Sequence, residues 1–393
     1  MDRSKWEYKK LGEVCTVVSG STPKTQVEEY WNGNHYWITP AELDGSTYVS
    51  KSGRLITDAA IEKTNLTLLP IGTVLLSSRA PIGKVAITTV PMYCNQGFKN
   101  LICSDAIFNK YLYWFLKVNT EYLNSLGRGA TFKEISKTSV ENIKIPVYSI
   151  EDQQRVVAEL DCLNEMIALK QEQLKEFDKL AQSIFYDMFG DPVTNEKGWD
   201  VIELGTRCEV TSFKRVLIED VVDSGVPFIR GTELMALSKA TKGEKIDFTL
   251  FITPEHYEQV KAISGVPAVG DLLIPSINSE GNIWILDTDE PRYYKDGRVL
   301  WVHVNHDAYT SEALKFIMHI LLKKTYSVMA TGATFAELKL FVLRELKTIL
   351  PPLARQQQFA EKIQAIEAQK ELVKKSIAET QHLLDSRMDY YFD

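Results

Sequence analysis

The sequence EDQQRVVAELDCLNEMIALKQEQLKEFDKLAQSIFYDMF, at Glu151–Phe189, decides the organisation of the chain. Its apolar residues recur every seven positions in two interleaved series, and only Lys170 interrupts them. No Gly or Pro occurs in this stretch before Gly190 and Pro192, which are typical residues after a helix end. A helix of this length extends about 58 Å at 1.5 Å per residue. Such a seam predicts a helical partner, although a long helix packed on its own domain is the simpler alternative.

The chain supplies a partner through an internal repeat. Four stretches of the first half recur in order in the second: W-x4-LG at Trp6 and Trp199, WITPAEL and FIRGTEL at Trp37 and Phe228, GTVLLSSRAPIGKVAI and GDLLIPSINSEGNIWI at Gly72 and Gly270, and GATF at Gly129 and Gly332. The offset drifts between 191 and 203 in the globular parts and then stays at 203. This behaviour indicates variable loops on a fixed frame.

The constant offset predicts a second long helix at Gln356–Tyr391, with breaks in its seam at Lys370, Thr380 and Arg387. The two helices are expected to run antiparallel as a coiled coil, with pseudo-two-fold symmetry and a globular part at each end. The predicted seam residues are Val156, Leu160, Leu163, Ile167, Leu174, Phe177, Ile184, Phe359, Ile363, Ile366, Val373, Ile377 and Leu384. In the repeat, Lys170 of the first helix corresponds to Val373 of the second, so the same seam position is charged in one helix and apolar in the other.

The predicted fold class is mixed α/β, with two repeated globular domains that are each followed by a long helix. The expected divisions are a first globular domain at 1–149, a helical spacer at 150–190, a second globular domain at 191–350 and a second spacer at 351–393. Without strict βαβ alternation, a doubly wound parallel sheet is not supported. Short apolar runs predict strands at Gly12–Ser19, Thr73–Ser77, Lys84–Thr89, Leu272–Ile274 and Asn282–Leu286, and helices at Asn109–Lys117 and Glu312–Lys324.

Composition narrows the class of protein. The hydrophobic and charged fractions are 45% and 25%, as in ordinary globular proteins. The N-terminal MDRSKWEYKK has no apolar signal-peptide core, and the five cysteines form no CxxC pair. These features predict a cytoplasmic protein with reduced thiols.

The net charge of −7 is unevenly distributed. Residues 1–147 hold 17 Lys/Arg against 13 Asp/Glu, a net of +4, whereas residues 148–197 hold 5 against 11, a net of −6. Because phosphates respond to the local surface, the total charge does not exclude a nucleic-acid partner.

Catalytic signatures are missing from the sequence. It contains no GxGxxG or GxxxxGK[ST] loop, no HExxH and no GxSxG. The acid-x-Lys pattern at Glu337-Leu338-Lys339 is common, and no upstream Asp partner can be placed for a nuclease. The residues alone thus give no candidate catalytic residues and no metal site, and an enzyme with an unrecognised site stays an alternative.

Glycine-bearing loops instead carry side chains that can contact DNA. Arg can bind guanine edges, Asn and Gln can bind adenine edges, and Lys and hydroxyls suit phosphates. In the first half the candidates are Ser21, Thr22, Lys24, Arg79, Lys84, Asn95, Gln96, Lys99, Arg128, Thr131 and Lys133. In the second half they are Lys214, Arg215, Arg230, Thr232, Asn278, Ser279, Thr331 and Thr334. Each loop alone could be an exposed polar turn; recurrence in both halves favours the set.

The whole chain resembles a type I restriction–modification specificity subunit. The resemblance rests on W-x4-LG, STP in the first loop, LLSSRAPIG with NQGF, GATF, and the helix entries IPVYSIEDQQR and LPPLARQQQ. Two departures are Val-Tyr-Ser where Pro-Pro is usual in the first helix entry, and the lack of a clear NQGF in the second half.

The resemblance implies two target-recognition domains that read the halves of a split, asymmetric site in double-stranded DNA. It implies that the helices hold these domains apart and dock two modification subunits, which bind S-adenosylmethionine and methylate adenine. Restriction (motor–nuclease) subunits, where recruited, would use ATP and Mg²⁺, and no cofactor would be bound by this chain. The alternative from the residues alone is a duplicated coiled-coil adaptor that binds protein and does not read DNA.

Overall fold

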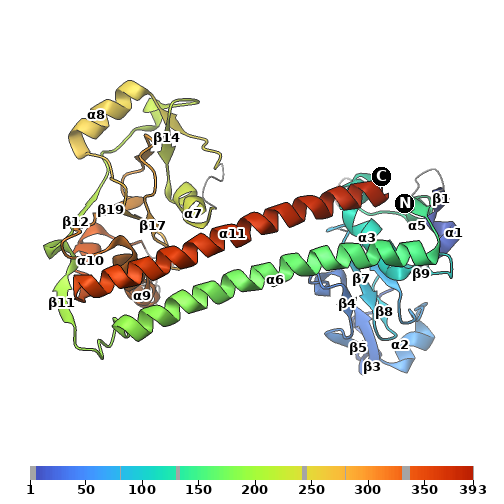
Figure 1. Cartoon of the computed structure of the whole chain (residues 1–393). Coiled ribbons are helices and arrows are strands. Elements are labelled where there is room, and N and C mark those ends of the chain that lie inside the picture. The colour runs from blue at the N-terminus through green and yellow to red at the C-terminus, as the bar shows by residue number, and fades with distance from the viewer. Residues whose placement is uncertain are drawn as a thin grey trace. The chain divides into compact units, whose positions relative to one another are not determined.

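The chain folds into two compact units in the computed structural model, which describes residues 6–79, 81–129, 133–240, 246–278, 280–329 and 337–392. Unit 1 comprises Met1–Leu169 and Ala378–Asp393, and unit 2 comprises Lys170–Ile377. Each unit contains one globular part and segments of both long helices, α6 (Ile150–Phe189) and α11 (Leu353–Phe392), which are green and red in Figure 1. The four-part division predicted from the sequence follows different boundaries and stays a prediction.

The globular part of unit 1 is a mixed α/β fold. Its described strands form sheets with the orders β2-β9-β6-β7-β4, β5-β3-β8 and β1-β10. The elements are β1 (Glu7–Lys10), α1 (Leu11–Val14), β2 (Cys15–Ser19), β3 (Trp31–Ile38), β4 (Tyr48–Val49), β5 (Arg54–Ile56), α2 (Asp58–Lys63), β6 (Val74–Leu76), β7 (Val85–Thr88), β8 (Tyr93–Cys94), β9 (Lys99–Cys103), α3 (Asn109–Val118), α4 (Thr120–Leu126), α5 (Lys137–Glu141) and β10 (Lys144–Val147).

Unit 2 repeats this architecture with different loops. Its described strands form sheets with the orders β12-β19-β16-β17, β13-β15-β14-β18 and β11-β20. The elements are β11 (Asp200–Glu203), β12 (Glu209–Ser212), β13 (Val221–Val222), β14 (Val226–Ile229), α7 (Gly231–Lys239), β15 (Phe251–Ile252), α8 (Pro254–Ser264), β16 (Leu272–Pro275), β17 (Trp284–Ile285), β18 (Tyr293–Tyr294), β19 (Val299–His303), α9 (Ser311–Met329), α10 (Leu340–Arg344) and β20 (Lys347–Leu350).

Strand pairing reproduces the sequence repeat. The antiparallel pair β2–β9 corresponds to β12–β19, and β1–β10 corresponds to β11–β20. The parallel pair β3–β8 likewise corresponds to β14–β18. Most pairs are antiparallel, which agrees with the predicted mixed α/β class and excludes a doubly wound parallel sheet.

One predicted strand is partly wrong. The run Gly12–Ser19 begins as the short helix α1 and becomes strand β2 only at Cys15. The Glu13 carboxylate accepts a hydrogen bond from the Lys10 backbone N–H at 3.2 Å, which stabilises the helical turn. The local cap therefore overrides the β preference of the apolar run.

Both long helices occur where the heptad pattern predicts them, and most seam residues are shielded from solvent. Buried seam residues are Val156, Leu160, Leu163, Ile167, Phe359, Ile363, Ile366 and Leu384. Half-buried seam residues are Leu174, Phe177, Ile184, Val373 and Ile377. This burial agrees with the predicted seam, while supercoiling of the helices stays a prediction.

Polar pairs occupy the positions where the seam is not apolar. In unit 2 the Lys170 ammonium donates to the Ser376 hydroxyl at 2.8 Å, and Lys370 donates to Asp178 at 2.8 Å. Partner numbers fall on α11 as they rise on α6, so these segments run antiparallel. In unit 1 the Arg387 Nε donates to Glu159 at 2.9 Å. The charged residues of the seam thus have specific partners on the other helix.

Each long helix ends in an aromatic cluster. Phe189 at the end of α6 packs in unit 2 against Phe359, with ring centroids 5.2 Å apart. Phe392 at the end of α11 packs in unit 1 against Tyr111 and Phe115, at 5.2 and 5.8 Å. The matching positions in the repeat therefore bury equivalent rings in both units.

A fully buried glutamine fixes the start of each helix. Gln153 accepts a hydrogen bond from the Phe108 N–H at 2.8 Å and donates to the carbonyl oxygens of Ala106 and Tyr148 at 3.0 and 2.9 Å. Gln356 makes the same three contacts, with the Thr310 N–H and the carbonyls of Ala308 and Pro351. The QQ motif of the sequence is therefore a structural clamp between the helix start and the loop before α3 or α9.

We predict that Gln153→Ala destabilises unit 1 by about 2–4 kcal/mol, because it leaves three backbone groups without their partner. The neighbouring Gln154 is exposed, so Gln154→Ala should change stability by less than about 0.5 kcal/mol. Urea unfolding followed by circular dichroism measures both effects. Equal destabilisation by the two variants would contradict the clamp.

Candidate DNA interface

Four loops of the first half are joined by hydrogen bonds into one surface. The Thr22 hydroxyl donates to the Gln96 side chain, and the Ser21 N–H donates to the Cys94 carbonyl at 3.0 Å. The Ser78 N–H donates to the Gly97 carbonyl at 2.7 Å, and the Ser78 carbonyl accepts from Ile135 N–H at 2.9 Å. The described parts of the segments 19–25, 77–84, 94–100 and 127–135 thus meet although they are far apart in sequence.

One glutamate forms ion pairs with two cations of this surface. Glu134 pairs with Arg79 at 3.0 Å and with Lys99 at 3.1 Å. Burial by itself would raise the pKa of Glu134, but the hydrogen bonds from Lys99 and Arg79 outweigh it and hold that pKa below its usual value. The carboxylate therefore stays ionised beside the two cations.

The predicted residues of the first half divide into two groups. Lys99 is 7% exposed and Lys84 donates to the carbonyls of Pro40 and Leu43 at 3.3 and 2.8 Å, so the fold itself uses both ammonium groups. The exposed or half-exposed candidates are Ser21, Thr22, Lys24, Arg79, Asn95, Gln96, Arg128 and Lys133. Thr131 lies outside the described residues. The geometry favours the second group for contact with a ligand.

Within the Asn95-Gln96-Gly97 turn the two amides have different surroundings. Asn95 accepts a hydrogen bond from the Gly97 N–H at 2.9 Å through its own side chain and so shapes the turn. Gln96 is exposed and is oriented by Thr22. Gln96 is therefore the amide that the turn presents to solvent.

The second half distributes its predicted residues differently. Lys214, Arg215 and Thr232 are exposed. Arg230 donates its Nε to both oxygens of Glu233 at 3.1 Å, and although burial would raise the pKa of Glu233, the Arg230 hydrogen bond contributes to lowering it to about 2. Arg230 is thereby held at the start of α7.

The last candidates of the second half are unfavourably placed or lie outside the described residues. Asn278 is 4% exposed and closes a turn through hydrogen bonds with the Asn282 backbone at 2.6 and 3.0 Å, so its amide is used internally. Ser279, Thr331 and Thr334 lie outside the described residues.

The structure identifies the counterpart of the NQGF turn that the sequence did not reveal. The Lys295 N–H donates to the Ile229 carbonyl at 2.8 Å, as the Asn95 N–H does to Ile38 at 3.0 Å. Lys295-Asp296-Gly297-Arg298 therefore replaces Asn95-Gln96-Gly97. The sequence did not reveal this turn clearly, because it is one residue longer than the turn of the first half and shares only the glycine with it.

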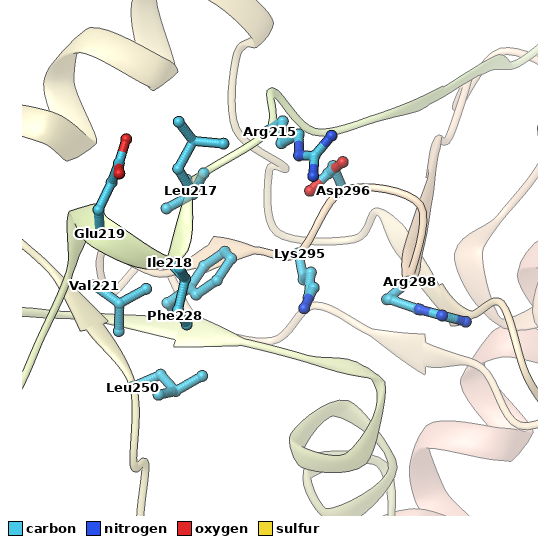
Figure 2. Close-up of a pocket in the computed structure, with 11 residues that line it drawn as sticks. Arg215, Leu217, Ile218, Glu219, Val221, Phe228, Leu250, Lys295, Asp296 and Arg298 are labelled. Carbon is cyan, nitrogen blue, oxygen red and sulfur yellow. The ribbon is translucent and has the colours of Figure 1, made fainter.

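A surface pocket of about 380 Å³ lies beside this second turn. Figure 2 shows Arg215, Lys295 and Arg298 around it, with Phe228 among its apolar residues and Arg298 extending away from them. Ile218 at the same pocket is 82% exposed. The second turn thus places Lys295, Asp296 and Arg298 where the first half places amides, and Arg215, Ile218 and Glu219 line the same pocket from another loop.

We predict that Glu134→Gln lowers the stability of unit 1 by about 1–2 kcal/mol at pH 7, because Lys99 loses its charged partner. Since the pKa of Glu134 is lowered in the folded state, its stabilisation is present above the unfolded pKa and is lost as the pH falls through the folded pKa. The difference between wild type and variant should therefore shrink below about pH 4.3. Chemical unfolding across pH 3–8 measures this, with Glu121→Gln at an exposed helix position as the control.

Within the described ranges, no helix combines the length and apolar character needed to cross a lipid bilayer. The same residues include no group of three or more His, Cys, Asp or Glu side chains placed to hold a metal ion.

Comparison with known proteins gives matches of one kind. The family model described as the type I restriction modification DNA specificity domain matches residues 3–178. The MjaIX specificity subunit of a type I restriction enzyme from Methanocaldococcus jannaschii is 36% identical over 251 residues, which are 58% of this chain and 58% of that protein. The MjaVIII specificity subunit from the same organism is 25% identical over 384 residues, 92% of this chain and 86% of that protein.

Solved structures share the fold over nearly the full chain. The S subunit of a type I restriction–modification system from M. genitalium aligns with a TM-score of 0.56 and 16% identity, covering 99% of this chain and 96% of that chain. A chain from a structural study of complex assembly and conformational transition of the type I R-M system aligns with a TM-score of 0.63 and 17% identity, covering 98% and 97%. Residues 3–178 thus match a type I restriction modification DNA specificity domain, and the whole chain is similar in sequence and fold to type I restriction–modification specificity subunits.

Proposed function

We propose that this chain binds double-stranded DNA sequence-specifically and reads a bipartite, asymmetric site, one half with each globular domain. The observation that carries the proposal is that two different sets of polar side chains are mounted on the same backbone platform. The Ser78 N–H donates to Gly97 in the first domain, and the Ser276 N–H donates to Arg298 at 2.9 Å in the second. A shared frame with exchanged side chains is what reading two unrelated half-sites requires.

Charge supports the same function in the first domain. Lys24, Arg128 and Lys133 are exposed around the joined loops, where they can neutralise phosphates. The exposed amide of Gln96 lies among them, and a carboxamide can form two hydrogen bonds with an adenine edge. The surface therefore combines groups for affinity with groups for base recognition.

Partner subunits complete the proposed activity. The chain would act as a non-catalytic scaffold for two modification subunits, which bind S-adenosylmethionine, and for restriction subunits that use ATP and Mg²⁺. A related chain comes from a study of complex assembly in a type I R-M system, which supports assembly with other subunits here. We place this complex in the cytoplasm, where its DNA substrate lies.

Expression of the chain with its modification subunits should methylate adenine in one split sequence. Replacing residues 1–147 with the corresponding domain of another specificity subunit should change one half of that sequence only, because the two domains carry separate reading surfaces. Sequencing of methylated adenines in the host genome measures both halves and the spacer. A swap that changes both halves, or neither, would contradict the assignment of one half-site to each domain.

The alternative function is a duplicated adaptor that binds protein without reading DNA. The two are separated by measuring DNA binding of the reconstituted complex against salt. Sequence-selective binding that weakens as salt rises supports the specificity subunit. Its complete absence in an assembled complex would favour the adaptor.

A further inference from the structure

Each globular domain holds an exposed arginine against a glutamate. In the first domain Arg79 Nε lies 3.0 Å from Glu134, and in the second Arg298 Nη1 lies 3.5 Å from Glu337. The exposed fractions of the side chains match closely, 45% and 34% in the first pair and 49% and 31% in the second. Both pairs are therefore open to a ligand on one side.

The two glutamates are equivalent in the repeat, but the arginines are not. Glu134 and Glu337 are each the second residue after the GATF motif, at the constant offset of 203. Ile277 occupies the position of Arg79 in the second domain, and Arg298 arrives from the turn before β19. The same acid is thus supplied with a guanidinium from a different loop.

The backbone around both pairs is also conserved between the domains. The residue after Glu134, Ile135, donates its N–H to the Ser78 carbonyl at 2.9 Å, and the residue after Glu337, Leu338, donates to Ser276 at 2.7 Å. Each acid therefore lies next to the equivalent serine, which follows β6 in the first domain and β16 in the second. The same arginine–glutamate pair is thus built with an arginine from a different loop in each domain, which indicates that the pair itself has a role.

A carboxylate beside a guanidinium restricts where the remaining N–H groups point. Guanidinium carries five N–H donors in a planar fork, and one carboxylate contact leaves a pair of them for a second acceptor group. The hydrogen bond from Lys339 is the main cause that lowers the pKa of Glu337, and the charge of Arg298 adds to it. Glu337 consequently remains an anion at neutral pH.

The pairing also separates base recognition from phosphate binding. A carboxylate beside the guanidinium would be repelled by a DNA phosphate, although Lys99 or Lys339 on the same acid leaves each cluster with a net positive charge. Guanine presents two acceptors, O6 and N7, in the major groove, and a bidentate arginine is their commonest partner. An arginine that a carboxylate orients therefore suits a guanine edge better than a phosphate.

We propose that Arg298 reads a guanine in the half-site of the second domain, as Arg79 does in the first, and that Glu337 and Glu134 are the positioning residues. This inference rests on the proposed function. It assigns the specificity of the second domain to a residue that the sequence motifs did not reveal.

The experiment uses the reconstituted complex of this chain with its modification subunits and a duplex carrying the methylated site. Each guanine of the second half-site, on either strand, is replaced in turn by 7-deazaguanine, which lacks the N7 acceptor. Binding by the wild-type complex should weaken about 10- to 100-fold at one of these positions. Arg298→Lys, which keeps the charge and loses the fork, should weaken binding to the normal site similarly and make it indifferent to that same replacement.

Matched variants separate this role from a structural one. Arg79→Lys should give the same result at a guanine of the first half-site, and Arg155→Lys, at an exposed position of α6, should leave both half-sites unaffected. Glu337→Gln should reduce discrimination between guanine and adenine while strengthening binding to unrelated DNA. A merely structural loss would weaken both the discrimination between the bases and the binding to unrelated DNA.

The outcomes distinguish this inference from the proposed function. Sequence-selective binding without a guanine in the second half-site, or with unchanged sensitivity to 7-deazaguanine in Arg298→Lys, would overturn the role of Arg298 alone. No sequence-selective binding at all would overturn the proposed function and this inference with it.

Discussion

The architecture depends on one buried carboxamide at the start of each long helix. Gln153 and Gln356 are inaccessible to solvent, and each satisfies one backbone donor and two backbone acceptors. Such groups would otherwise be buried without partners, so the loop before α3 or α9 and the first turn of the helix must keep their mutual geometry. Because the same contacts occur twice, the loops can vary without moving the helix that follows each domain.

A second constraint acts within the helix seam. An apolar heptad ladder alone tolerates a shift by one repeat, since each shift places apolar residues against apolar residues. A shift by one heptad would replace Ser376 and Asp178 by Leu383 and Phe185, or by Gln369 and Gln171, so the ion pair of Lys370 would be lost. One of these polar interruptions, Lys170, occupies a seam position where the other helix has Val373. The polar pairs therefore specify the alignment of the helices, which the apolar residues only stabilise.

The frame could be predicted from the sequence, and the reading surface only in part. Heptad spacing and the constant offset of 203 depend on local periodicity, so both helices and the duplication followed directly. Burial depends on contacts between distant segments, which is why the sequence suggested Lys99 as a surface ligand although Glu134 binds its ammonium. Asn278 instead uses its amide to close a local turn with Asn282. The sequence did not reveal Arg298, because the role proposed for it depends on Glu337, which contacts it from 39 positions away in sequence.

These differences explain how one platform can carry two specificities. The contacts that hold the reading loops together run mainly through backbone groups, such as Ser78 to Gly97 and Ser276 to Arg298, so they do not depend on which side chain is presented. The acid after GATF is kept as a side chain in both domains, and it pairs with an arginine from a different loop in each. Exchange of a few exposed residues can then alter the chemistry of recognition without a change in stability or in the position of the helices.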